Sequence, residues 1–163
     1  MKSIIVGVKV PQERHEVFAF LDVLANHEPF TDHVLVDWSF DGPRAGVGAK
    51  ARMRANVRGP KQWLDMEVIS ADAPVTSTEE SIGANGRRRT RGTYTLKDLP
   101  DGGTDIQFEL AYLAVPPIER MFGPFIRASM KRANAKAMRR LSQTLSELPA
   151  PASEAPQRAA ANG

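Results

Sequence analysis

The sequence contains no cysteine among its 163 residues. This absence excludes disulfide bonds, metal sites built from thiolates, and cysteine nucleophiles. It agrees with a reducing compartment, in which disulfides rarely form. We therefore expect a cytoplasmic protein.

Long apolar runs are also missing. No segment approaches the roughly 18 consecutive apolar residues of a membrane-spanning helix, so the sequence predicts no transmembrane segment. The apolar stretch that follows Met1 and Lys2 is soon interrupted by Lys9 and Glu13. It is too short for a secretory signal peptide, which again favours the cytoplasm.

Several chemistry-bearing motifs are absent. Gly46 and Gly48 lack the third glycine of a dinucleotide-binding loop, and no Gly-Lys-Ser or Gly-Lys-Thr follows them. No Gly-x-Ser-x-Gly segment marks a nucleophilic serine. His27 and His33 flank Glu28 but do not have the His-Glu-x-x-His spacing of a metal site. We predict neither a metal nor a cofactor.

Size and charge indicate one ordinary globular domain. The charged fraction of 25% is typical of such proteins. A net charge of +3 without aromatic residues interleaved among basic ones predicts no nucleic-acid partner. Residues 149–163 are rich in Ala, Pro and Ser and have no periodicity, so they form a predicted disordered tail after a single domain at 1–148.

Short strands make up most of the domain. Alternation of apolar and polar residues, with turn residues between the segments, predicts strands at 4–10, 34–40, 49–57, 63–68, 75–82, 87–96 and 104–112. Helical spacing predicts a helix at Pro11–Ala25, with a turn or small helix at 27–32. The loops are short, as antiparallel neighbours require.

The chain closes with the longest predicted helix, Pro116–Leu148, which is kinked or restarted at Pro124. Its apolar stripe is large at both ends and small in the middle, at Ser129, Ala133 and Ala137. The opposite face carries Arg127, Lys131, Arg132, Lys136, Arg139 and Arg140. That basic face is interpreted as solvated, with a weak membrane-surface contact as the alternative.

These elements predict an α+β fold of the helix-grip type. About seven antiparallel strands form a curved sheet around the long C-terminal helix, and two small helices follow the first strand. A helix of about 30 residues is roughly 45 Å long. It needs a broad curved surface to lie against.

The order and spacing of several short motifs resemble those of the START-like (SRPBCC) helix-grip superfamily, in particular its polyketide cyclase/dehydrase and lipid-transport group. The matching segments over residues 2–148 are Pro11 with 17–21 and Asn26, 42–43 with 46–48, 67–68 with 72–74, 92–96, 103–104 and the closing helix. The resemblance implies a cavity between sheet and helix that holds a hydrophobic or amphipathic small molecule. Its members range from carriers to cyclases.

Small residues at inward positions favour a hollow interior independently of the resemblance. Alanines at 49, 51, 55, 133 and 137 and Gly92 would face each other across the sheet and helix. An apolar lining with few polar anchors suits an apolar ligand. The predicted ligand-binding residues are Ala51, Met53, Ala55, Met66, Gly92, Tyr94, Phe108, Leu110, Tyr112, Phe122, Phe125, Ile126, Ser129 and Ala133.

Few titratable residues are expected inside. His27 and Glu28, near the rim, could act as base and acid on a ketone, and Tyr94 or Tyr112 could stabilise an enolate oxygen. The simpler interpretation of His27 is a helix end or a surface residue, and that of both tyrosines is core packing. The basic residues of the middle strands are expected to form cross-strand ion pairs on the outer face. Lys50, Arg52 and Arg54 would pair with Asp65 and Glu67, and Arg87, Arg88, Arg89 and Arg91 with Glu79 and Glu80.

Two functions follow from these observations. The first is binding or transport of a hydrophobic or amphipathic molecule such as a lipid, a quinone or a polyketide. The second is a cyclase or dehydratase reaction that uses pocket His and Tyr groups for proton transfer. The sequence is compatible with a monomer or a homodimer.

Overall fold

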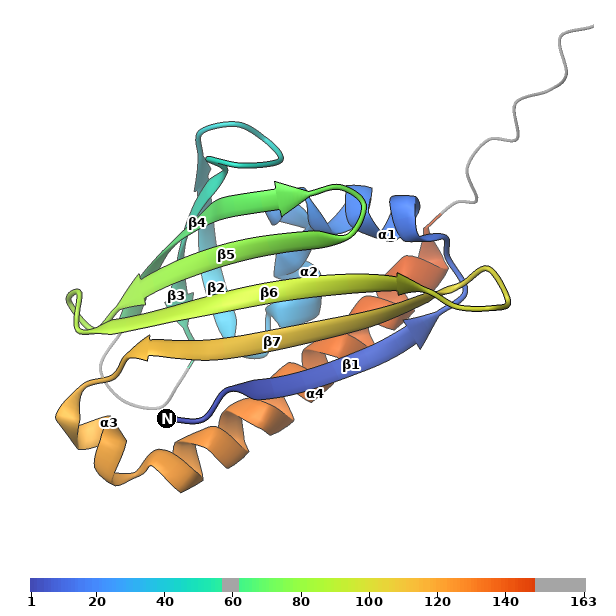
Figure 1. The fold of residues 1–163 in the computed structure, drawn as a ribbon. Coiled ribbons are helices and arrows are strands. Elements are labelled where there is room, and N and C mark those ends of the chain that lie inside the picture. Colours follow the sequence, from blue (N-terminus) through green and yellow to red (C-terminus); the bar gives the residue numbers. More distant parts are fainter. Residues whose placement is uncertain (57–61, 149–163) are drawn as a thin grey trace, which may run out of the picture.

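The computed structural model describes residues 1–56 and 62–148, which form one antiparallel sheet gripping a long helix (Figure 1). The sheet order is β1-β7-β6-β5-β4-β3-β2. Only β1 and β7 pair across the two ends of the chain, whereas the other pairs are sequential hairpins. The strands are β1 (Ile4–Val10), β2 (Leu35–Asp41), β3 (Lys50–Ala55), β4 (Gln62–Asp72), β5 (Thr76–Gly83), β6 (Arg88–Asp98) and β7 (Thr104–Ala114).

The helices lie between β1 and β2 and after β7. They are α1 (Arg14–Leu21), a 3-10 turn (Leu24–His27), α2 (Glu28–Thr31), α3 (Pro117–Met121) and α4 (Gly123–Glu147). The predicted α+β fold is therefore confirmed, with seven strands and the long closing helix. The predicted tail and Val57 at the end of the third strand lie outside the described residues. None of the described helices is both long and apolar enough to cross a bilayer.

The first predicted helix is shorter than expected. A capping box between Glu13 and Glu16 starts α1. The helix ends because the chain beyond Leu21 is drawn to the loop between β2 and β3. There Val23 forms an isolated bridge with Ala45, and the amide of Gly46 donates to the carbonyl of Asp22 at 3.3 Å. The displaced chain makes a 3-10 turn that carries His27 inward.

The closing helix restarts where proline predicts a break. α3 ends at Met121, Phe122 joins the two helices, and Pro124 lies in the first turn of α4. Proline is tolerated there because the first amides of a helix have no intrahelical acceptor.

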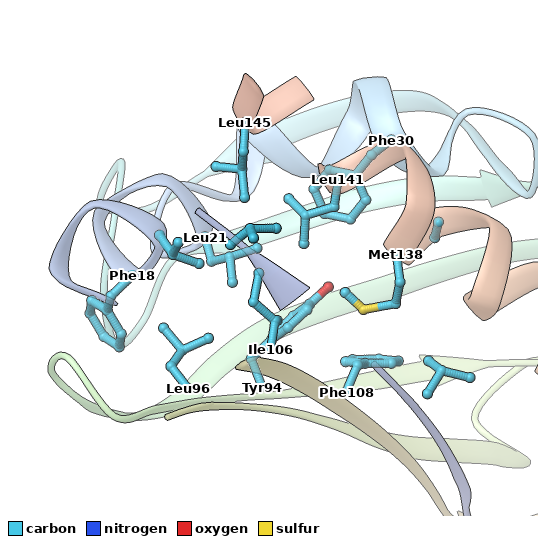
Figure 2. Close-up of a cluster of buried hydrophobic side chains, with 14 of the residues drawn as sticks. Phe18, Leu21, Phe30, Tyr94, Leu96, Ile106, Phe108, Met138, Leu141 and Leu145 are labelled. Carbon is cyan, nitrogen blue, oxygen red and sulfur yellow. The ribbon is translucent and has the colours of Figure 1, made fainter. Parts of the chain in front are cut away.

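The main core lies between the second half of α4, α1, α2 and the sheet (Figure 2). Leu141 and Leu145 of α4 point toward Leu96 and Ile106 of the sheet, and all four are almost completely buried. Each such side chain contributes about 1.5–3 kcal/mol by leaving water. This cluster fixes the helix against the sheet.

The first half of α4 corrects the predicted apolar stripe. Phe122 and Phe125, predicted to face the pocket, are 55% and 77% exposed, and Ser129 is also exposed. Counting back from Leu141 in steps of three or four residues leads through Asn134 and Met130 to the inner face. Phe125 lies on the opposite side of the helix, whereas Phe122 precedes α4 and is exposed at its junction with α3.

Candidate functional site

The inner surface of the sheet has a buried half and an open half. Alternating residues of β7 illustrate the division, because Ile106 and Phe108 are buried whereas Leu110 and Tyr112 are only partly so. We call the partly exposed inward residues the open half. They are Ala55, Leu64, Thr90, Leu110, Tyr112, Ile126, Met130 and Ala133. This surface lies under the first half of α4, where that helix has turned its phenylalanines outward.

A buried polar stripe runs along β5. The strand turns Ser77, Glu79 and Ser81 inward and their neighbours outward. Glu79 occupies the middle of the stripe, and only 11% of its side chain is accessible. A carboxyl group in this position is unusual, since an ionised carboxylate loses its hydration on burial.

His27 faces Glu79 from the 3-10 turn. Its Nε2 lies 2.7 Å from the carbonyl oxygen of Leu21, which can only accept, so Nε2 carries the proton. In the neutral ring Nδ1 is then a free acceptor. It lies 3.8 Å from Oε2 of Glu79. The imidazole is 3% exposed and also contacts the rings of Phe30 and Tyr94.

Burial shifts the titration of both groups toward their neutral forms. Desolvation lowers the pKa of His27 from 6.5 to about 4, against the opposing effect of the Leu21 hydrogen bond. It raises the pKa of Glu79 from 4.5 to about 7. Between about pH 4 and pH 7 the His27–Glu79 pair therefore holds its titratable proton on the carboxyl group. That group exchanges it within the physiological range.

Tyr94 and Gly92 of β6 complete the surroundings of this carboxyl group. Burial, followed by the nearby charge of Glu79, raises the pKa of Tyr94 well above 10. A Cβ atom at Gly92 would lie 2.9 Å from Oε1 of Glu79 and 2.9 Å from the ring of Phe108. The gap expected above Gly92 is thus filled by these two side chains. The glycine is required to make room for the acid.

A second polar group lies at the far end of the open half. Arg88 on β6 forms an ion pair with Glu119 on α3, and its Nη1 donates to Gln62 at 3.0 Å. Nearby, the hydroxyl of Tyr112 and Nε of Arg127 are buried without a hydrogen-bond partner among the described residues. Burial raises the pKa of Tyr112, whereas the charges of Arg88 and Arg127 oppose the rise. The unpartnered hydroxyl of Tyr112 and Nε of Arg127, close to the guanidinium group of Arg88, leave this end of the surface incompletely satisfied.

The predicted catalytic candidates separate in the structure. His27 and Tyr94 come together at Glu79, while Tyr112 lies at the other polar group. Glu28 is exposed at the start of α2 and faces away from this cluster. Sequence reasoning assigned Glu79 to the outer ion pairs and so missed it. The residue in the sequence that could have indicated a buried Glu79 is Gly92, its partner on the neighbouring strand β6.

The predicted ligand-binding residues also divide. Ala51, Met53, Met66, Tyr94 and Phe108 are buried. The residues that line the open half are Ala55, Leu110, Tyr112, Ile126 and Ala133.

The outer face of the sheet carries the predicted ion pairs and a groove of about 520 Å³. Lys50 pairs with Glu67 and Arg52 with Asp65, which confirms part of the ladder. Glu80 forms ion pairs with both Arg89 and Arg91. The apolar part of the groove is Phe40, Ile69 and Ile82. Most of the charges on its rim are already paired, namely Lys50, Arg52, Asp65, Glu67 and Glu80.

By sequence, neither a family model nor a curated protein matches this chain. Solved structures do match. The protein TTHA0849 of Thermus thermophilus aligns with a TM-score of 0.73 and 17% identity, over 89% of this chain and 97% of that one. Major latex-like protein 151 of Panax ginseng aligns with a TM-score of 0.62 and 9% identity, over 88% of this chain and 96% of that one. DynU16, a protein of the dynemicin biosynthetic locus, aligns with a TM-score of 0.63 and 16% identity, over 90% of this chain and 48% of that one.

This chain has the START-like helix-grip fold. The resemblance inferred from short motifs is therefore confirmed at the level of the fold. At identities of 9% to 17%, however, the likeness shows the fold alone, and the chemistry of this chain must be argued from its own residues.

Proposed function

We propose that the protein binds an amphipathic small molecule on the open half of its inner surface. The observation that carries this proposal is that the inward apolar side chains of Leu64, Leu110 and Met130 stay partly exposed where they pack beside the buried clusters. Apolar surface that faces inward yet remains accessible is typical of a ligand site. The helix-grip fold supports the same conclusion.

The polar groups indicate how such a ligand would lie. Its apolar body would contact Leu110 and Met130, and an oxygen-bearing end would meet the unpartnered hydroxyl of Tyr112 and Nε of Arg127. A carboxylate suits this end because guanidinium groups form strong charge-assisted hydrogen bonds with it. Lipids, quinones and polyketides all combine an apolar body with oxygen atoms. A fatty-acid-like molecule fits the charge best.

The proposal is tested by titrating the full chain with cis-parinaric acid, a fluorescent fatty acid, and with its methyl ester. We expect the acid to bind more tightly than the ester. Tyr112→Phe should weaken binding of the acid by about 10- to 150-fold, the range for one lost hydrogen bond to a charged group. Ala133→Phe, which fills the open half, should weaken both probes.

Ile82→Glu is the matched control, because it blocks the groove on the outer face and leaves the interior unchanged. Binding should survive this substitution. Loss of binding in Ile82→Glu together with full binding in Tyr112→Phe and Ala133→Phe would place the ligand outside the sheet. That result would overturn the proposal.

The His27–Glu79 pair favours a second function, proton transfer on a carbonyl substrate of the cyclase or dehydratase type. In a dehydration of a β-hydroxy ketone, the Glu79 carboxyl would protonate the departing hydroxyl, which leaves as water. The carboxylate would then recover a proton from the α-carbon, so that enone and water are the products. The neutral Nδ1 of His27, an acceptor, faces this acid at 3.8 Å.

Exchange of α-deuterium from deuterated 2-octanone, followed by NMR, tests this second function. We expect exchange to be faster with the protein than without it, and Glu79→Gln to reduce the excess rate by about 10²–10⁴-fold. Glu80→Gln, one residue away on the outer face, is the control and should leave the rate unchanged. Equal rates with and without the protein would leave only the binding function.

A further inference from the structure

We propose that the exposed face of α3 and α4 docks on the surface of a bilayer that contains anionic lipid. Large apolar side chains gather at one end of this face, and basic side chains follow along the helix. The proposal concerns an outer surface and does not depend on the ligand proposed above.

The apolar part, here called the tip, consists of four side chains within eight residues. Ile118 and Met121 on α3 are 59% and 70% exposed, and the exposed Phe122 and Phe125 continue onto α4. Single exposed apolar residues are common on protein surfaces, whereas a cluster of four large ones marks an interaction site. The tip lies at the end of α4 remote from α1 (Figure 1).

The basic part follows on the same face of α4. Arg132, Lys136 and Arg139 come seven, eleven and fourteen residues after Phe125, spacings that return to one side of a helix. All three are exposed. The helix contains six basic residues and no acidic residue before Glu147, its last position. The exposed face therefore carries uncompensated positive charge.

Two other arginines of α4 have partners within the protein. Arg127 donates to the carbonyl of Ser3 at 3.1 Å, and Arg140 pairs with Asp32, so both serve the fold. By contrast, Arg132, Lys136 and Arg139 have no acidic partner within 4 Å among the described residues. Their charge is free to attract an outside surface.

A bilayer with anionic headgroups fits both parts at once. Phenylalanine, methionine and isoleucine enter the boundary between headgroups and acyl chains, while basic residues remain among the phosphates. Nucleic acid would satisfy the basic residues but would leave the side chains of Ile118 and Met121 in water. The ion pair between Glu119 on α3 and Arg88 on β6 ties the tip to the sheet, so docking would bring the open half close to the membrane.

The test is co-sedimentation of the full chain with vesicles of phosphatidylcholine, with and without phosphatidylglycerol. We expect binding only to the vesicles with phosphatidylglycerol, weakening as salt is added. Phe122→Ser with Phe125→Ser should reduce the partition constant by about a hundredfold, since each buried phenylalanine contributes about tenfold or more. Arg132→Glu with Lys136→Glu should reduce it by about 25-fold or more, because each basic residue near the surface contributes about fivefold.

Matched controls place the same changes elsewhere. Val47→Ser removes an exposed apolar side chain from a loop, and Arg44→Glu with Lys97→Glu makes the same change in net charge. Neither control should lower binding by more than about twofold. The proposal is refuted if wild-type protein does not bind better to vesicles with phosphatidylglycerol than to those without it. It is also refuted if the double serine variant binds as well as wild type. Loss of fatty-acid binding with vesicle binding intact would count against the proposed ligand only.

Discussion

Replacing the buried acid Glu79 with glutamine should change how the protein's stability depends on pH. In the wild type, the two buried groups act in opposite directions. Glu79 has a folded pKa raised from 4.5 to about 7, so folding becomes less favourable as pH rises through that window. His27 has a folded pKa lowered from 6.5 to about 4, so folding becomes less favourable as pH falls through its window.

The two effects cancel where the windows overlap. Between pH 4.5 and 6.5 the unfolded chain has lost the proton of Glu79 and gained the proton of His27, while the folded protein has done neither. The number of bound protons is then equal in both states, and these two groups contribute no slope. A wild-type free energy of unfolding that is nearly flat across this range follows.

Glu79→Gln removes one of the two terms. The remaining histidine should make the free energy of unfolding rise by about 1.4 kcal/mol per pH unit from pH 4.5 to 6.5. Above pH 7 the variant should be more stable than wild type by up to about 3 kcal/mol, since the wild type must bury a charged carboxylate there. His27→Gln should show the opposite slope over the same range.

Urea denaturation monitored by tryptophan fluorescence at a series of pH values measures these slopes. Glu80→Gln is the control, because this neighbouring acid is paired with Arg91 and Arg89, which hold its pKa below 4.5. Glu80→Gln should lower the free energy of unfolding only slightly, and only at pH values at which Glu80 is ionised, as is usual for a surface ion pair. If Glu79→Gln runs parallel to wild type at all pH values, Glu79 titrates like an exposed acid and the reasoning about the buried pair is wrong.

Three further substitutions test the packing by urea denaturation. Gly92→Ala should destabilise the protein by about 1–3 kcal/mol, because the new Cβ overlaps Phe108 and the buried acid; an unchanged midpoint would show that this space is not filled. Leu141→Ala should cost about 2–5 kcal/mol, whereas Phe125→Ala on the opposite face should change stability by less than about 0.5 kcal/mol; similar losses would contradict the assigned helix faces. Tyr112→Phe should be neutral or stabilising by up to about 1 kcal/mol, since its hydroxyl has no partner; a clear loss would reveal a hydrogen bond at this position.

The open half and the docking face together suggest how the parts of the molecule serve one another. The tip on α3 is linked to the sheet by Arg88 and Glu119, at the end where the inner surface is accessible. A protein that takes an amphipathic ligand from a bilayer, or returns it, needs its opening near the headgroups. The two proposals remain separable because one is measured with a soluble fatty acid and the other with vesicles.

The sequence alone determined the strands whose two faces differ in polarity, and the fold that they build. In β3 and β7 apolar and polar residues alternate, so local periodicity assigns each side chain to a face. The restart of the closing helix was equally local, since Pro124 disrupts helical hydrogen bonding wherever it stands.

Tertiary structure decided the position of the buried acid. Along β5 the residues on both faces are mostly polar, so no periodicity separates Glu79 from Glu80. Only pairing with β4 and β6 turns one inward to His27 and the other outward to its arginines. Likewise, Phe122 and Phe125 have an apolar character that predicts burial, yet the packing of Leu141 and Leu145 sets the rotation of α4 and leaves them in solvent. Periodicity along a chain describes one element, whereas the contacts between elements determine which of its faces is buried.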